Sequence, residues 1–93
     1  MKNKRIKDGF GMVSTTVLRD PNISLGEKAV YAYLSTFADN ITNELFVSVS
    51  KIANELNISS STVKRSLIKL EQKNIIKRES RGYKTSKLTT LLK

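Results

Sequence analysis

The sequence predicts a mainly α-helical domain with a core of three helices, followed by a small β-hairpin. Three observations predict this architecture. Apolar residues recur at helical spacing in three segments, 25–38, 49–56 and 60–73. After residue 74 the pattern changes to two short runs of strand-forming residues separated by a turn at 80–82. The chain of 93 residues is long enough for one domain with one modest core.

The N-terminal segment divides into an arm and a lead-in. Residues 1–8 are basic and lack periodicity, which predicts a flexible arm; a frayed, solvated end is favoured over a contact to phosphates. Residues 9–93 then form the single domain. From residue 9 to residue 17 we expect a short strand or an irregular lead-in that places Phe10 and Met12 on the core.

The first long helix, 25–38, follows a turn at 19–22, where Pro fixes φ and Asp and Asn make local hydrogen bonds. Ser24 and Glu27 have the spacing of a capping box, in which each side chain satisfies a backbone N–H at the other position. Four residues are predicted to share the apolar face, with Ala29 and Ala38 beside it: Val30, Tyr33, Leu34 and Phe37. Three aromatic residues are expected to serve packing rather than the stacking of a ligand: Tyr31, Tyr33 and Phe37.

The second helix, 49–56, is predicted to begin after an N-cap at Ser48. Its buried face repeats at positions i, i+3, i+4 and i+7: Val49, Ile52, Ala53 and Leu56. The small side chain of Ala53 is expected where two helices cross closely over a short turn. Asn57 should adopt the left-handed conformation that ends the helix, and Ile58 should turn back into the core.

The third helix, 60–73, separates a buried face from a polar one. Ser60 is predicted as its N-cap, with Ser59 as the competing choice. At about 100° per residue, the buried side consists of Val63, Leu67 and Leu70. The opposite side and its flanks carry hydroxyls and cations: Ser61, Thr62, Lys64, Arg65, Lys69 and Gln72. This arrangement is typical of the second helix of a helix-turn-helix, which meets base edges and phosphates in the major groove of DNA.

The remaining apolar runs predict strands. Residues 45–47 form a short strand that joins the edge of the hairpin, whose two strands are expected at 75–79 and 83–91. Gly82 supplies the positive φ that a tight hairpin needs. The hairpin carries four cations: Arg78, Arg81, Lys84 and Lys87. Contact with the DNA backbone or minor groove is favoured over a role in keeping the sheet edge from aggregating.

The net charge of +9 is unevenly distributed. Residues 1–50 contain six Lys and Arg against five Asp and Glu, a balance of +1, whereas residues 51–93 contain eleven against three, a balance of +8. The positive charge therefore belongs to the half that holds the turn, the third helix and the hairpin. A nucleic-acid surface is favoured there over a merely solubilising one.

The string 52–76 resembles the winged helix-turn-helix domains of bacterial, phage and plasmid DNA-binding proteins, through ANELNIS, STVKRSLIKLE and KNII. The closest similarity is to phage or plasmid replication proteins and small regulators of mobile elements. The spacing of Val63, Ser66 and Leu67 favours the winged variety, and upstream GFGMV, LRDPNIS and YAYLSTFA are similar to how such domains open. Asn57 departs from the pattern, which prefers Gly. The resemblance implies a short helical turn near 15–18 and a wing at 75–91.

These observations together predict sequence-specific binding of double-stranded DNA, with helix 60–73 in the major groove and the wing on the backbone or minor groove. Arg65 is expected to contact a base edge, Ser60 and Ser61 with the helix N-terminus to hold a phosphate, and the wing cations to add nonspecific affinity. The predicted DNA-binding residues are Lys51, Ser60, Ser61, Thr62, Lys64, Arg65, Lys69, Arg78, Arg81, Lys84 and Lys87. A transcription regulator and a replication accessory or initiator domain fit equally, and a homodimer on a two-fold site is plausible.

Other classes of function find little support. The chain contains neither His nor Cys, and its carboxylates are scattered, so neither catalytic residues nor a metal site is expected. No cofactor, small-molecule ligand or membrane partner is indicated, and a cytoplasmic location is expected. The alternative is a winged helix that binds protein within a replication or recombination complex, since a fold does not fix its function.

Overall fold

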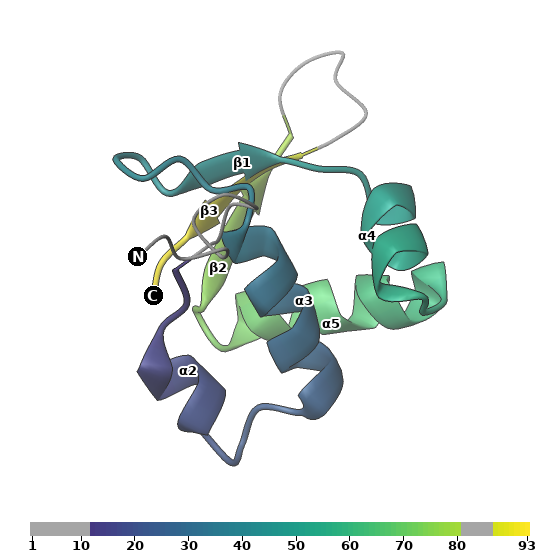
Figure 1. Cartoon of the computed structure of the whole chain (residues 1–93), viewed down its shortest axis with the longest axis horizontal. Coiled ribbons are helices and arrows are strands. Elements are labelled where there is room, and N and C mark those ends of the chain that lie inside the picture. The colour runs from purple at the N-terminus through teal and green to yellow at the C-terminus, as the bar shows by residue number, and fades with distance from the viewer. Residues whose placement is uncertain (1–11, 81–86) are drawn as a thin grey trace, which may run out of the picture.

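The computed structural model describes residues 12–80 and 87–93. Its elements are α2 (Thr15–Arg19), α3 (Leu25–Ser35), β1 (Glu44–Phe46), α4 (Val49–Leu56), α5 (Ser60–Gln72), β2 (Ile76–Glu79) and β3 (Leu88–Leu91). The three strands form an antiparallel sheet in the order β1-β3-β2. Figure 1 shows α3 running across α5, with α4 to one side and the sheet beside the C-terminal end of α3. The predicted mainly α-helical, winged helix-turn-helix architecture is confirmed.

The lead-in to the first long helix is itself helical. Ser14 caps α2, because its hydroxyl accepts a hydrogen bond from the backbone N–H of Val17, whose side chain is buried. Residues 15–17 are therefore helical, as the resemblance implied, and no strand is present there, whereas the described residues 12–14 are irregular, as the other alternative expected. Met12 is 81% exposed and does not lie on the core. Phe10 and the predicted arm of residues 1–8 lie outside the described residues.

The capping box at the start of α3 is confirmed. The Ser24 hydroxyl accepts from the backbone N–H of Glu27 and donates to its carboxylate, at 3.2 and 2.8 Å. The helix ends at Ser35, earlier than predicted, so Phe37 lies beyond it and is 40% exposed.

Tyr31, unlike Phe37, is buried and belongs to the core, although it was not assigned to the predicted apolar face. Its hydroxyl accepts from the backbone N–H of Ser14 at 3.1 Å and donates to the carbonyl oxygen of Lys93 at 2.8 Å. A buried tyrosine needs a partner for its O–H, and the segment before α2 and the end of the chain supply it. The buried residues of α3 form one helical stripe that includes Tyr31 but neither Tyr33 nor Phe37, so the stripe is shifted from the predicted face.

The turn between α4 and α5 follows the prediction closely. Ser48 caps α4, and Asn57 ends it in the left-handed region with φ of 56°. The backbone N–H of Ile58 then donates to the carbonyl oxygen of Ala53 at 3.0 Å, which closes the helix end. The N-cap of α5, however, is Ser59 rather than Ser60, because Ser59 is extended and its hydroxyl accepts from the backbone N–H of Thr62.

The sheet places one apolar face against the helices. Ile76 pairs with Leu91 and Arg78 with Thr89 across β2 and β3, while Leu45 of β1 pairs with Thr89 from the other edge. The predicted edge position of the strand near residues 45–47 is confirmed. Strand β3 ends at Leu91, as predicted for the second strand of the hairpin, and residues 81–86 lie outside the described residues.

One core joins the helices to the sheet. Its largest fully buried apolar side chains come from α3, α4, α5 and β2: Tyr31, Leu34, Ile52, Leu67, Leu70 and Ile76. At the periphery, the ammonium of Lys73 after α5 lies 2.6 Å from a carboxylate oxygen of Glu27 and 2.6 Å from the carbonyl oxygen of Asn22. This contact fixes the C-terminal end of α5 against the start of α3.

Candidate nucleic-acid interface

Helix α5 presents opposite chemistry on its two sides. Val63, Leu67 and Leu70 are at most 1% exposed and anchor the helix in the core. The outward side consists of exposed residues with hydroxyl or cationic side chains: Ser61, Lys64, Arg65 and Lys69. Because the core holds the apolar anchors, the Cα atoms of the outward residues keep a fixed position relative to the rest of the domain.

Hydroxyl groups organise the N-terminal end of this surface. The hydroxyls of Ser59 and Thr62 lie 2.8 Å apart, and Nη2 of Arg65 donates to the Thr62 hydroxyl at 3.3 Å. This long hydrogen bond leaves the other donors of the guanidinium available. Ser60 and Ser61 in the first turn are both exposed. The first turn of α5 therefore offers hydroxyls and backbone N–H groups beside an arginine that can still bind.

The outward cations of α5 are electrostatically uncompensated. Lys64, Arg65 and Lys69 form no ion pair with the described residues; the three ion pairs there involve other cations, at Lys51, Lys73 and Lys77. A long strip of positive charge without carboxylate partners attracts an anionic polymer.

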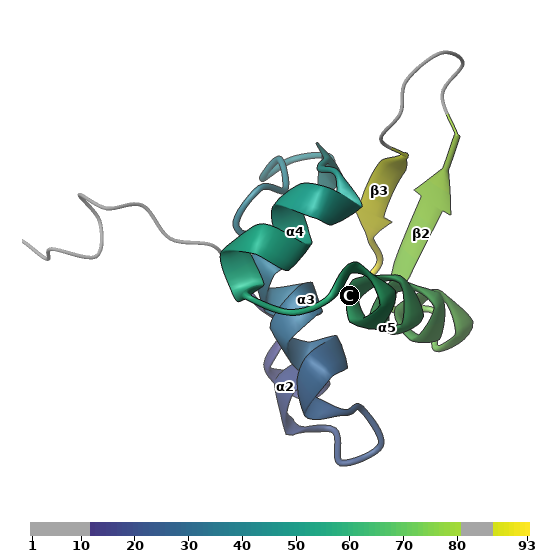
Figure 2. The ribbon, with the colours of Figure 1, turned by 90° about the vertical axis from the view of Figure 1, so that its right-hand side faces the viewer.

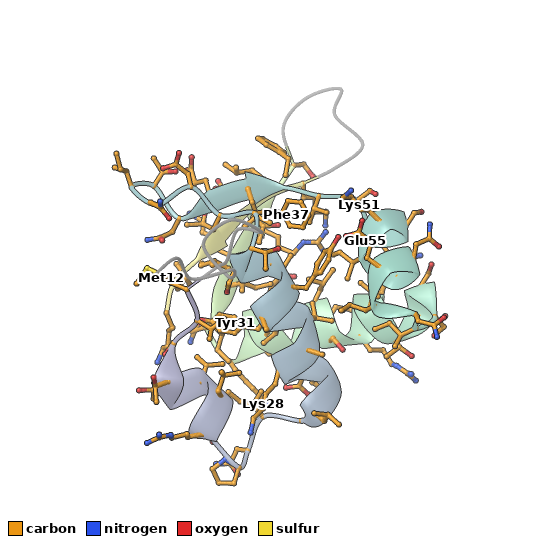
Figure 3. The ribbon with its side chains drawn as sticks, in the orientation of Figure 1. Met12, Lys28, Tyr31, Phe37, Lys51 and Glu55 are labelled. Atoms are coloured by element: carbon orange, nitrogen blue, oxygen red, sulfur yellow. The ribbon has the colours of Figure 1, made fainter. Side chains whose placement is uncertain are left out.

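Lys51 lies apart from this surface. Its ammonium is 3.4 Å from a carboxylate oxygen of Glu55 and 5.7 Å from the ring centroid of Phe37, and Figure 3 shows the three side chains gathered between α3 and α4. The hydroxyl of Tyr33 donates to the same carboxylate, and burial together with this hydrogen bond raises the pKa of Tyr33 to about 12. The structure thus does not bring Lys51 together with the cations of α5.

The cations predicted for the wing have different environments. Arg78 is half-buried and faces the same side of the sheet as Ile76; its Nε is buried without a hydrogen-bond partner among the described residues. Burial lowers the pKa of Arg78, and Glu71 partly opposes the shift. Lys87 is exposed at the start of β3, whereas Arg81 and Lys84 lie outside the described residues. Lys77, which was not predicted as a DNA contact, is exposed, and its ammonium lies 3.8 Å from a carboxylate oxygen of Glu79.

A groove between α3 and α5 was also missed. It has a volume of about 270 Å³ and is lined by Ser24, Gly26, Glu27, Thr62, Arg65, Ser66 and Lys69. No sequence signal places the start of α3 beside α5, since the segments are distant in the chain and the capping box explains Ser24 and Glu27 fully. The packing of α3 across α5 alone brings these residues together (Figure 2).

Within the described ranges, no helix is both long and apolar enough to cross a bilayer. The same ranges hold no group of three or more acidic side chains suited to a metal ion.

Comparison with known proteins agrees with this geometry. Residues 22–76 match the family model described as a helix-turn-helix domain, a span that covers more than half of the chain and includes α3, α4, the turn and α5. No curated protein and no solved structure matches the chain. With the apolar anchors of α5 buried and its cations turned outward, the chain belongs to the helix-turn-helix family of DNA-binding domains.

Proposed function

We propose that this protein binds double-stranded DNA in a sequence-specific manner, with α5 as the recognition helix. The observation that carries the proposal is the outward face of α5, where Lys64, Arg65 and Lys69 are exposed and have no acidic partner among the described residues. An α-helix with its side chains is about 10–12 Å across, which matches a major groove about 12 Å wide.

The residues of this face have distinct proposed roles. Arg65 contacts a base edge, because a guanidinium can bind O6 and N7 of guanine in a bidentate manner. Ser60 and Ser61 hold a phosphate at the start of α5. Lys64 and Thr62 lie on the flanks of this face. The wing cations add nonspecific affinity for the DNA backbone or minor groove: Arg78, Arg81, Lys84 and Lys87. Lys51 contributes least, since Glu55 already neutralises its charge.

The biological role proposed is that of a small transcription regulator or a replication accessory or initiator domain of a phage, plasmid or other mobile element. The resemblance of residues 52–76 to such proteins supports this role. A cytoplasmic location and pairing of two copies on a two-fold site complete the proposal, because one domain contacts few base pairs and half-site symmetry extends the recognised sequence. No step of it requires catalysis or a cofactor.

Selection from a random duplex pool, followed by titration of the selected and a scrambled duplex, tests the proposal. Arg65→Ala should weaken binding to the selected duplex by about 1–3 kcal/mol and relax the preference at one position. Lys87→Ala, the control from the wing, should weaken both duplexes alike and lower the salt slope by about one unit. Equal effects of the two variants on both duplexes would contradict the assigned roles, and absence of any duplex binding would refute the function.

The protein-binding alternative requires an apolar surface on the exposed side of α5. Within α5, Ile68 is the only exposed large apolar side chain, at 52%, and its sequence neighbour Lys69 is charged and exposed. A single isoleucine does not form the apolar centre of a protein interface. The composition of this face therefore favours DNA as the partner.

A further inference from the structure

The groove between α3 and α5 has a distinct charge. Two of its lining residues, Arg65 and Lys69, are cations without an acidic partner among the described residues, and a third, Thr62, carries a hydroxyl. All three lie on α5, on the side that faces the start of α3. The other wall is formed by Ser24 and Gly26, of which Gly26 has no side chain to fill the space.

The one carboxylate in the lining does not cancel this charge. One carboxylate oxygen of Glu27 lies 2.6 Å from the ammonium of Lys73, and the other accepts from the Ser24 hydroxyl at 2.8 Å. Burial opposes ionisation, but these two hydrogen bonds outweigh it and lower the pKa of Glu27, so the carboxylate is ionised and already paired. The charge left over in the groove is that of Arg65 and Lys69, which is positive.

The position of the groove determines which anion can reach it. Arg65 and Lys69 belong to both the groove and the outward face of α5, so a ligand in the groove lies directly beside whatever α5 binds. In a duplex, the bases of the major groove are bordered by the phosphates of the two strands, and proteins position themselves through those phosphates. The start of α3 is thus placed where the phosphate backbone of one DNA strand would pass beside the recognition helix.

We propose that this groove holds a backbone phosphate of the bound duplex between Lys69 and the start of α3. The first turn of α3 is then part of the DNA interface, and Lys69 contacts a phosphate rather than a base. This inference rests on the proposed function of α5 and adds a second contact surface to it, on a helix for which the sequence predicts only a capping box and an apolar face.

Gly26 allows the charge of the groove to be changed without disturbing the fold. A Cβ atom at this position would lie 3.6 Å from the Ser66 hydroxyl oxygen, an ordinary van der Waals distance. Alanine therefore fits, and a longer side chain can extend into the groove. Gly26 is also in the first turn of α3, where an aspartate is compatible with the helix dipole. Folding of each variant is confirmed by its thermal unfolding curve.

Substitutions of opposite charge at this position should change the affinity for DNA in opposite directions. Relative to Gly26→Ala, which adds only a Cβ atom and serves as the uncharged reference, Gly26→Asp should weaken binding to the selected duplex about five- to tenfold at low salt and Gly26→Lys should strengthen it by a similar factor. The slope of log K against log salt should become steeper by up to about 0.9 for Gly26→Lys, because one more phosphate is neutralised.

Asn40 provides a control with matched charge. It is exposed in the loop after the C-terminal end of α3, and about 13 Å of helix separates Gly26 from that end. Asn40→Asp and Asn40→Lys should change the affinity less than twofold. If these variants changed the affinity as much as those at Gly26, the effect would be that of net charge and the phosphate contact would be refuted.

A neutral methylphosphonate placed at each backbone position of the selected duplex identifies the phosphate itself. At one position flanking the major groove it should abolish the difference between Gly26→Asp and Gly26→Lys, and a difference that persists at every position would overturn the inference. If the groove holds no phosphate, the unaltered protein still binds the selected duplex. Failure of the unaltered protein to bind any duplex would instead refute the proposed function.

Discussion

The ion pair between Glu27 and Lys73 predicts that the two residues are energetically coupled in the folded state. The ammonium of Lys73 lies 2.6 Å from Glu27 and also donates to the carbonyl oxygen of Asn22. Removal of either side chain leaves the other without its charged partner. Glu27→Ala, Lys73→Ala and the double variant form a cycle that isolates the interaction of the two side chains.

The exposure of the two side chains sets the expected magnitude. Glu27 is 10% exposed and Lys73 is 32% exposed, so the pair is intermediate between a surface pair, worth about 0.2–1 kcal/mol, and a charged hydrogen bond, worth about 1.5–3 kcal/mol. We expect a coupling free energy of about 1–2 kcal/mol. Glu27→Ala alone should lower the free energy of unfolding by about 2–3 kcal/mol, since the Ser24 hydroxyl also loses its acceptor.

Urea unfolding followed by circular dichroism measures the cycle at pH 7, with the m-value checked for each variant. The pair formed by Lys51 and Glu55 serves as an internal comparison, because both side chains are 49% exposed and their coupling should be several times smaller. A Glu27–Lys73 coupling no larger than that of the exposed pair would refute the argument that α5 is held at its end by this contact.

The same contact gives the protein a pH dependence. Because the pKa of Glu27 is lowered in the folded state, its carboxylate contributes stability above the unfolded-state pKa, and this contribution is lost as the pH falls through the folded-state pKa. Glu27→Gln should reduce the pH dependence of stability in that acidic range. An unaltered acid transition in this variant would assign the loss of stability to other carboxylates.

Two further predictions concern the core and the turn. Leu70→Ala should lower the free energy of unfolding by about 2–5 kcal/mol, because Leu70 is completely buried; a loss below about 1 kcal/mol in urea unfolding would show that the core does not depend on it. Asn57→Ala should cost about 1 kcal/mol, whereas Asn57→Gly should be neutral or stabilising, because the backbone is left-handed there. Equal urea midpoints for these two variants would contradict that conformation.

The sequence predicts the turn and the polarity of α5 well because both are determined locally. Asn57, the cap at Ser48 and the spacing of Val63, Leu67 and Leu70 depend on neighbours within a few residues, and helical periodicity captures them. Ser59 was the competing choice for the N-cap of α5, and two adjacent serines differ only in their backbone conformation, which the letters do not specify.

Features determined by distant residues could not be predicted. The partners of the Tyr31 hydroxyl, Ser14 and Lys93, come from far along the chain, and no periodicity within α3 reveals them. The ammonium of Lys51 lies 5.7 Å from the ring centroid of Phe37, a neighbour that is distant in the sequence and that no local pattern indicates. The groove beside Gly26 likewise exists only because α3 crosses α5.

Helix α5 is fastened at both ends, by the left-handed residue Asn57 before it and by the bonds of Lys73 after it. A helix whose two ends are fixed in this way loses little conformational entropy when it binds a ligand. All its outward side chains project from one rigid backbone, so a tilt of the helix would displace all of them together. Discrimination between related targets can then depend on a few atoms at the surface, because the scaffold beneath them does not yield.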